Sequence, residues 1–259
     1  MSPSVIAHTE TSGLVRVIIN RPDKHNPLSL EVLQQMAAAL SDAAQQGHVR
    51  CAVIRGAGER YFAAGGDLRR LADVRTVVDT AAMMEASRMA LDAIRAFPLP
   101  VIALVNGDAL GGGAELAVAC DMRMVRAGAR IGFIQGRLNI CSAWGGGPDL
   151  FSLVGRARAL RMATRAELVD ADTALDWGLV DEVCPDDALD TAFDAFVAPI
   201  LKQTPLVLRA WKQQAQAARG LLPYADCRAI ERDMIVKTWT HDDHWSAVER
   251  VLPPSQETP

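Results

Sequence analysis

The sequence of 259 residues predicts an α/β fold with a helical C-terminal region. Short runs rich in β-branched residues alternate with helical patterns in the first half, which favours a layered core with right-handed crossovers. After Gly147 nearly every segment has a helical pattern. Because 50% of the residues are hydrophobic, the chain can bury a sizeable core. We expect an α/β core over residues 1–200 and a helical region over residues 201–259 that packs in an oligomer.

The strands and helices of the first half follow from residue patterns and stop signals. Ser29 is expected to cap a helix whose apolar residues repeat at helical spacing and which ends at Gly47. A second helix begins at Thr76 and is stopped by Pro98 and Pro100. The predicted strands are 14–20, 50–56, 101–106 and 121–127, the stretches 57–68 and 107–113 are interpreted as loops, and 114–120 as a short helix.

The second half is predicted to be mostly helical. Its expected helices cover 148–154, 157–164, 171–177, 188–202, 205–219 and 224–238, with one short strand over 179–184. His241 and His244 have a spacing that some metal sites use, but we prefer a helix start capped by Thr240 with acidic residues in its first turn. We therefore expect no bound metal.

Composition and charge exclude several classes of function. The net charge is −4 and the sequence has no basic stripe, which argues against nucleic acid as a partner. No apolar run approaches the roughly 20 residues of a membrane span, and the N-terminal residues have no apolar signal core. The five cysteines have no metal-site spacing and are interpreted as free thiols in a reducing compartment. We expect a cytoplasmic protein without membrane contact.

The segment NGDALGGGAELAVACD, residues 106–121, carries the first candidate site. A strand, a glycine loop and a helix follow one another there, which leaves backbone N–H groups available for an anion or for an oxygen that becomes one. A similar loop, 62–68, also follows a strand. Two such amides can converge on one carbonyl oxygen, and Glu115 can move protons beside it. Close helix packing, with Glu115 complementing the helix dipole, explains the same pattern, and the pattern by itself favours that alternative.

Four segments together resemble the crotonase, or enoyl-CoA hydratase/isomerase, superfamily. NRPDKHNPLS (20–29) is similar to its early loop, while YFAAGGDL (61–68) and VNGDALGGGAELAVACD (105–121) are similar to its two oxyanion segments. ALDWGLVDEV (174–183) is similar to a further block of the superfamily. The resemblance covers most of the chain. It implies a spiral of ββα units whose helical C-terminal part supports a homotrimer or a dimer of trimers.

The resemblance also implies a coenzyme A thioester as the substrate, with no separate cofactor. The thioester oxygen would accept hydrogen bonds from the amides of Gly66 and Gly112, with Glu115 as the general acid and base. The residues that would line the coenzyme A arm are Lys24, His25, Ala64, Asp67 and Leu68.

Gln135 departs from the pattern of the superfamily. Its hydratases use a second glutamate, and the matching residue here is Gln135 within IGFIQGRLN (131–139). An amide can orient water but exchanges no proton at neutral pH. The next segment, ICSAWGGGPDL (140–150), also departs. Its Trp144 is interpreted first as a core residue, with the wall of the pocket where the acyl group would end as the alternative. Hydration, double-bond isomerisation and decarboxylation of a malonyl-type thioester therefore stay open.

The alternative from another class is a protein of this fold that binds RNA or a protein partner without catalysis. Such a protein needs a basic surface or a defective oxyanion site. The net charge of −4 and the intact sequence GGGAE (111–115) argue against it.

Overall fold

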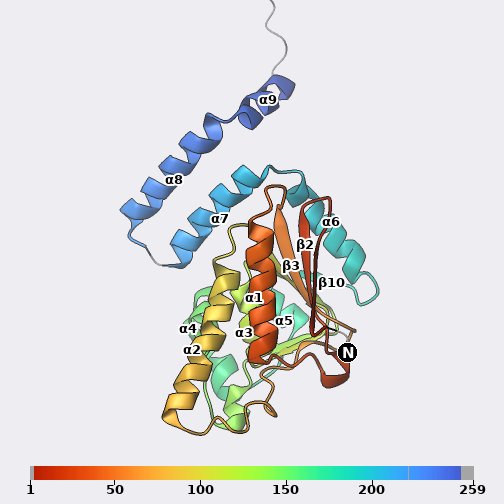
Figure 1. Cartoon of the computed structure of the whole chain (residues 1–259). Helices are drawn as coiled ribbons and strands as arrows, with labels where there is room; N and C mark the ends of the chain where they lie inside the picture. The colour runs from red at the N-terminus through yellow and green to blue at the C-terminus, as the bar shows by residue number, and fades with distance from the viewer. Residues whose placement is uncertain (1–2, 221, 252–259) are drawn as a thin grey trace, which may run out of the picture.

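The computed structural model describes residues 3–220 and 222–251 and contains two β-sheets surrounded by helices (Figure 1). The larger sheet has the strand order β1 (Val5–Thr9), β2 (Leu14–Ile19), β3 (Cys51–Gly56), β5 (Val101–Val105), β7 (Met122–Arg126) and β10 (Glu182–Cys184). The smaller sheet has the order β4 (Tyr61–Ala63), β6 (Asp108–Leu110), β8 (Arg130–Gly132) and β9 (Val169–Asp170). The pairs β1–β2 and β8–β9 are antiparallel, and the pairs that join β2, β3, β5, β7 and β10, or β4, β6 and β8, are parallel.

The helices occupy the connections between strands and most of the second half. They are α1 (Leu30–Ala44), α2 (Val77–Arg95), α3 (Gly112–Ala119), α4 (Gly146–Arg165), α5 (Ala171–Asp176), α6 (Leu189–Leu201), α7 (Pro205–Arg219), α8 (Tyr224–Trp239) and α9 (Asp242–Val251), with short 3₁₀ helices η1 (Pro22–Lys24) and η2 (Gln135–Leu138). Among the described residues, no helix is long and apolar enough to cross a lipid bilayer.

The chain passes from the larger sheet to the smaller one and then into a helix several times. β3 leads to β4 and α2, β5 leads to β6 and α3, and β7 leads to β8 and then η2 and α4. Because β3, β5 and β7 pair in parallel, as do β4, β6 and β8, each unit lies beside the preceding one. This arrangement confirms the predicted α/β class and the spiral of ββα units. It also surrounds α3, every residue of which is buried.

The long helices of the first half begin where the sequence predicts. The hydroxyl of Ser29 accepts a hydrogen bond from the amide of Val32 at the start of α1. The hydroxyl of Thr76 does the same for the amide of Asp79 at the start of α2. In the second half, Gly155 adopts a positive φ of 76° inside α4 and divides it close to the gap between the two helices predicted there.

Several short strands were not predicted. Residues 57–68 and 107–113, interpreted as loops, contain β4 and β6, and β1, β8 and β9 were not expected either. Most of these strands are only two or three residues long, so they cannot show the alternation that identifies a strand in a sequence. Helix α3 begins at Gly112, earlier than expected, and the strand predicted over 179–184 is confined to its last residues.

Helix α7 packs one face against the core. Four long polar side chains on this face, Arg209, Lys212, Gln216 and Arg219, reach core groups that include the carboxylate of Asp121 and the carbonyl of Arg95. Lys212 is buried and its Nζ lies 2.6 Å from Oδ1 of Asp121. The predicted division near residue 200 lies at the end of α6, and α7, beyond it, is attached to the core by these contacts.

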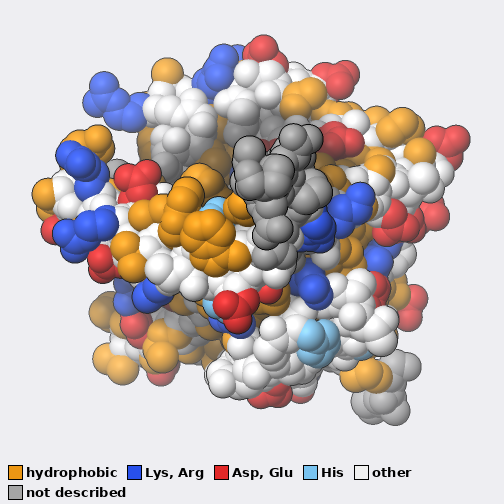
Figure 2. Space-filling view, turned by 90° about the horizontal axis from the view of Figure 1, so that it is seen from above, with side chains coloured by type: hydrophobic (Ala, Val, Ile, Leu, Met, Phe, Trp, Pro, Cys, Tyr) orange, Lys and Arg blue, Asp and Glu red, His pale blue; other side chains and the backbone are white. Residues whose placement is uncertain are grey.

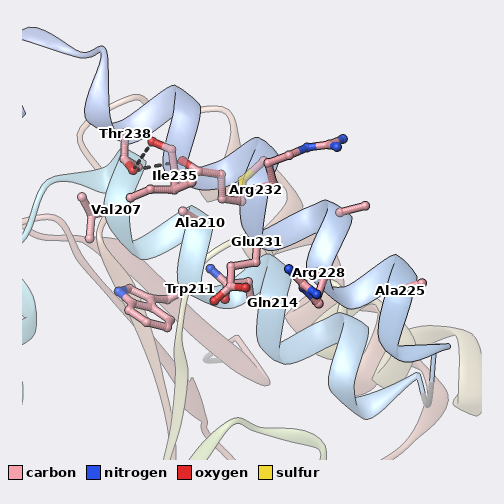
Figure 3. Close-up of a pocket in the computed structure, with 12 residues that line it drawn as sticks. Val207, Ala210, Trp211, Gln214, Ala225, Arg228, Glu231, Arg232, Ile235 and Thr238 are labelled. Carbon is pink, nitrogen blue, oxygen red and sulfur yellow. Dashed lines mark hydrogen bonds between the residues drawn. The ribbon is translucent and has the colours of Figure 1, made fainter.

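Helices α8 and α9 project from one end of the molecule, with α7 between them and the core (Figure 1). A groove of about 700 Å³ lies between α7 and α8, and Val207, Ala210, Ile235 and Thr238 are among the residues around it (Figure 3). Figure 2, which views the molecule from this end, shows hydrophobic side chains gathered on the surface. The exposed large apolar residues of this region are Trp211, Leu222, Tyr224, Ile235, Val236, Trp239 and Trp245.

Candidate active site

Helix α3 begins immediately after β6 with an available backbone donor. Gly111 links the two elements with a φ of 53°, a conformation that L side chains rarely adopt. Its amide donates to the carbonyl of Gly132, 2.8 Å away. The amide of Gly112 donates to no residue that the structure describes. The first turn of α3 therefore offers an N–H group at the positive end of the helix dipole.

The loop after β4 carries a second such amide. Leu28 donates to the carbonyl of Gly65 at 2.8 Å and accepts from the amide of Asp67 at 3.1 Å, so the loop is fixed on both sides of Gly66. The amide of Gly66 itself has no acceptor within the described parts of the chain. A Cβ atom on Gly65 would lie 3.6 Å from the amide nitrogen of Gly112. The two glycine loops are thus in contact.

One cavity of about 360 Å³ brings most of the predicted site residues together. Its lining includes Ala64, Gly66, Leu68, Gly112, Glu115, Gln135 and Trp144. Leu71, Met83, Leu138 and Ile140, which sequence reasoning missed, add an apolar wall from the turn after β4, from α2 and from the segment around η2. Apolar residues at such scattered positions carry no motif, so nothing in the sequence identified them.

Lys24, His25 and Asp67, predicted for the coenzyme A arm, lie outside the lining of this cavity. Lys24 and His25 are exposed at the end of η1. The His25 ring packs on Tyr61 with 4.5 Å between ring centroids. The carbonyl of His25 accepts a hydrogen bond of 3.1 Å from the amide of Ala64, which connects this loop to the cavity wall.

Asp67 is buried in an ion pair that supports the loop of Gly66. Nη1 of Arg21 lies 2.9 Å from its Oδ2, and both side chains are nearly covered. Burial acts to raise the pKa of Asp67, but hydrogen bonding and charge from Arg21, assisted by Arg70, outweigh it and hold that pKa below its usual value. Asp67 is therefore engaged by the protein itself.

The indole of Trp144 lies over both glycines. A Cβ atom on Gly112 would lie 2.7 Å from Cη2 of the indole, and one on Gly66 would lie 3.7 Å from the same atom. Any side chain at residue 112 would therefore collide with the ring. The ring edge therefore lies against both glycines and lines the cavity that they share.

The carboxylate of Glu115 accepts hydrogen bonds on both oxygens. The side chain is 3% exposed. Its Oε2 accepts from the amides of Trp144 at 2.8 Å and Gly146 at 3.0 Å. Its Oε1 accepts from Nε2 of Gln135 at 3.0 Å and from the amide of Ala143 at 3.4 Å. Glu115 thus fixes the turn before α4 through Oε2, while its Oε1 faces the neutral side chain of Gln135, which also lines the cavity.

The peptide backbone of Trp144 is held from two directions. Glu115 accepts from its N–H group, and Nη2 of Arg95 donates to its carbonyl at 3.1 Å. Arg95 is itself fixed by Asp149, with N–O distances of 2.8 and 3.0 Å, and Arg219 of α7 donates to the same carboxylate. Arg95 and Asp149 carry no recognisable motif, and sequence reasoning did not identify them.

Cys141 lines the cavity and is exposed. The thiols of Cys51, Cys120 and Cys184 are buried, and burial raises the pKa of the first two to about 12 and that of Cys184 to about 11. Thiol reactivity in the folded protein is therefore concentrated on the accessible side chains.

The prediction that Thr240 caps the last helix is wrong. Thr240 ends α8, and its hydroxyl donates to the carbonyl of Val236 at 2.8 Å. His241 takes the capping role, because its Nδ1 accepts from the amide of Asp243 at 3.2 Å. A ring nitrogen thus substitutes for the hydroxyl expected from sequence preferences. Within residues 3–220 and 222–251, no group of three or more histidine, cysteine or acidic residues is placed to hold a metal ion.

Comparisons with known proteins give a consistent family. The family model for enoyl-CoA hydratase/isomerase matches residues 9–251. The chain is 37% identical to the 2,3-dehydroadipyl-CoA hydratase of Escherichia coli (strain K12) over 236 residues, 90% of each chain. It is 29% identical to the ethylmalonyl-CoA decarboxylase of Bos taurus over 250 residues, 95% of this chain and 81% of the relative.

The fold also matches solved structures of enoyl-CoA hydratases. A crystal structure of an enoyl-CoA hydratase from Bacillus anthracis matches with a TM-score of 0.90 and 26% identity, covering 96% of both chains.

Proposed function

Because the chain belongs to the enoyl-CoA hydratase/isomerase family, we propose that its cavity binds an acyl-CoA thioester and stabilises the thioester enolate. The observation that carries this proposal is the meeting of two available amides, of Gly66 and Gly112, with one carboxylate, Glu115, in a single cavity. In the proposed complex both amides donate to the thioester oxygen. Their donation strengthens as negative charge develops on that oxygen, which is how an oxyanion hole lowers a barrier.

Glu115 is proposed as the acid and base of this site. In hydration, Oε1 of Glu115 takes a proton from water while the water oxygen bonds to Cβ of an enoyl thioester. The electron pair of the Cα–Cβ double bond forms the double bond of the enolate, and the carbonyl electron pair moves onto the thioester oxygen, where the amides hold it. Glu115 returns the proton to Cα, so one carboxylate serves first as the base and then as the acid. Gln135, which shares Oε1 of Glu115, is proposed to orient the water.

Decarboxylation of a 2-carboxyacyl thioester is the second candidate, and Gln135 favours it. Loss of CO₂ leaves the bonding electron pair on the thioester as an enolate, and one proton then adds at Cα. This sequence needs the oxyanion amides and one proton donor, whereas hydration in this family uses two carboxyl groups. The bovine relative, which aligns with 95% of this chain, is an ethylmalonyl-CoA decarboxylase, and this supports the same candidate.

A panel of substrates tests both candidates. Crotonyl-CoA, a 3-enoyl-CoA and methylmalonyl-CoA are incubated separately with the protein, and products are identified by mass spectrometry. Addition of water, movement of the double bond and loss of CO₂ give three different product signatures. Failure to convert or to bind any of them refutes the acyl-CoA proposal, and salt-dependent RNA binding by the same preparation would favour the non-catalytic alternative.

We propose that Lys24 and His25 contact the coenzyme A arm outside the cavity, next to Ala64, which follows β4. The hydrogen bond from Ala64 to His25 supports this placement, because it fixes the loop beside the cavity. Asp67 is proposed to act indirectly, since Arg21 occupies its carboxylate. A charge change at Lys24 should therefore weaken coenzyme A binding while leaving the melting temperature unchanged.

We propose that α8 and α9 assemble with neighbouring copies as a trimer or a dimer of trimers. The exposed apolar residues along these helices support the proposal, since Tyr224 is 79% exposed and Trp239 is 54% exposed. The groove between α7 and α8 offers additional apolar surface. Light scattering at micromolar concentration measures the mass directly, and a monomer would contradict the proposal.

A further inference from the structure

We infer that Trp144 limits the acyl group of the substrate to short chains, a specificity that rests on the acyl-CoA function proposed above. The indole lines the cavity and lies against Gly66 and Gly112, whose amides are proposed to hold the thioester oxygen. If these amides hold the thioester oxygen, the first carbons of the acyl chain lie close to the indole. Extra carbons in this direction would meet the ring.

The ring has little freedom to move away. On one side it is in contact with the backbone of Gly112, because even a Cβ atom there would collide with it. Its own backbone is fixed by Glu115 at the N–H group and by Arg95 at the carbonyl. Trp144 is only 7% exposed. Making room for a longer chain would therefore need the indole itself to rotate against its packed surroundings.

The remaining space is small. The cavity of about 360 Å³ is near the lower end of the range for small-molecule sites, and the thioester group must share it. The apolar residues Leu71 and Met83 suit a hydrocarbon chain, so the restriction comes from size. In a hydrophobic pocket, one methylene more or less changes selectivity by roughly 10- to 200-fold.

The test compares binding and turnover of butyryl-, octanoyl- and dodecanoyl-CoA and their 2-enoyl forms. The proteins are the wild type, Trp144→Ala, Trp144→Phe and the control Trp177→Phe. Trp177 is a suitable control because it is 8% exposed, like Trp144, but lies outside the cavity lining. Calorimetry gives the dissociation constant of each saturated thioester, and melting temperatures verify folding.

We expect the wild type and Trp177→Phe to prefer butyryl-CoA. Trp144→Ala should raise the ratio of octanoyl- to butyryl-CoA affinity by at least about tenfold, with a smaller rise for Trp144→Phe. If the wild type binds every chain length and the ratios are unchanged in folded Trp144 variants, this inference is wrong while the acyl-CoA function stands. If the wild type binds none of the thioesters, the proposed function itself fails. Should Trp144→Ala not fold, the ratio in Trp144→Phe decides.

Discussion

Replacing Glu115 by glutamine separates the two tasks that the structure gives this residue. The variant keeps the shape of the side chain and removes its charge. Its remaining carbonyl oxygen can accept from the amides of Trp144 and Gly146, as Oε2 does now. Its new NH₂ group replaces Oε1, so Gln135 can turn its own carbonyl to accept from it, while the long 3.4 Å bond from the amide of Ala143 is lost. The turn before α4 should therefore stay in position.

The expected loss of stability is modest and the expected loss of activity is large. Hydrogen bonds to a charged group contribute about 1.5–3 kcal/mol each and neutral ones about 0.5–1.5 kcal/mol, so weakening the two bonds at Oε2 costs about 2 kcal/mol. Turnover should fall by roughly 10² to 10⁴, the usual contribution of a general acid or base. Glu115→Ala should differ, because it leaves two buried amides without acceptors and costs about 2–6 kcal/mol.

The assay measures three quantities for each variant: unfolding free energy in urea, thioester affinity and turnover of the true substrate. Glu85→Gln, an exposed glutamate on α2, serves as the matched control for charge removal. Affinity for the thioester should stay nearly constant in Glu115→Gln, because the amides of Gly66 and Gly112 remain. Full activity of a folded Glu115→Gln variant would refute the assignment of Glu115 as the base and would leave a decarboxylase that uses the oxyanion amides alone.

Three further outcomes follow from other contacts. Gln135→Glu places a second carboxyl group where the amide now lies 3.0 Å from Glu115, so the pair should share a proton and raise crotonyl-CoA hydration by about 10²-fold. Gln135→Ala should lower turnover only slightly. Unchanged hydration in Gln135→Glu would show that the cavity has diverged elsewhere. The ion pair with Arg21 holds the pKa of Asp67 below its ordinary value, so the pair stabilises the fold above about pH 4 and this stabilisation is lost as pH falls through the folded pKa. In Asp67→Asn, the unfolding free energy from urea titrations should fall less steeply over this acid range. An unchanged acid dependence would contradict the ion pair. Alkylation of Cys141 should slow when butyryl-CoA is bound, as mass spectrometry can follow, and equal rates would place the ligand outside this cavity.

The sequence predicts the elements that carry their own signals. α1 was predicted because Ser29 is a capping residue and the apolar positions repeat at helical spacing, and α2 because a long helical pattern ends before Pro98 and Pro100. β4, β6 and β8 were missed because three residues are too few to show a period. Their pairing depends on strands tens of residues away, which local patterns cannot indicate.

The residues of the candidate site also divide into those that the sequence could predict and those that it could not. Gly66, Gly112 and Glu115 were identified from glycine loops after strands and from the family resemblance, and the structure places all three at one cavity. The backbone amides of Trp144 and Gly146 that bind Glu115 could not be predicted, because every residue except proline has such a donor and only the fold selects which ones are used.

The way residue 144 is held has a consequence for how this protein can change over evolutionary time. Glu115 and Arg95 bind the main chain of this residue, which any amino acid other than proline supplies in full. A mutation at this codon can therefore exchange the side chain in the cavity while the turn and the carboxylate keep their geometry. With the role inferred above for Trp144, one substitution at this residue changes the acyl preference and leaves the proposed chemistry of Glu115 in place.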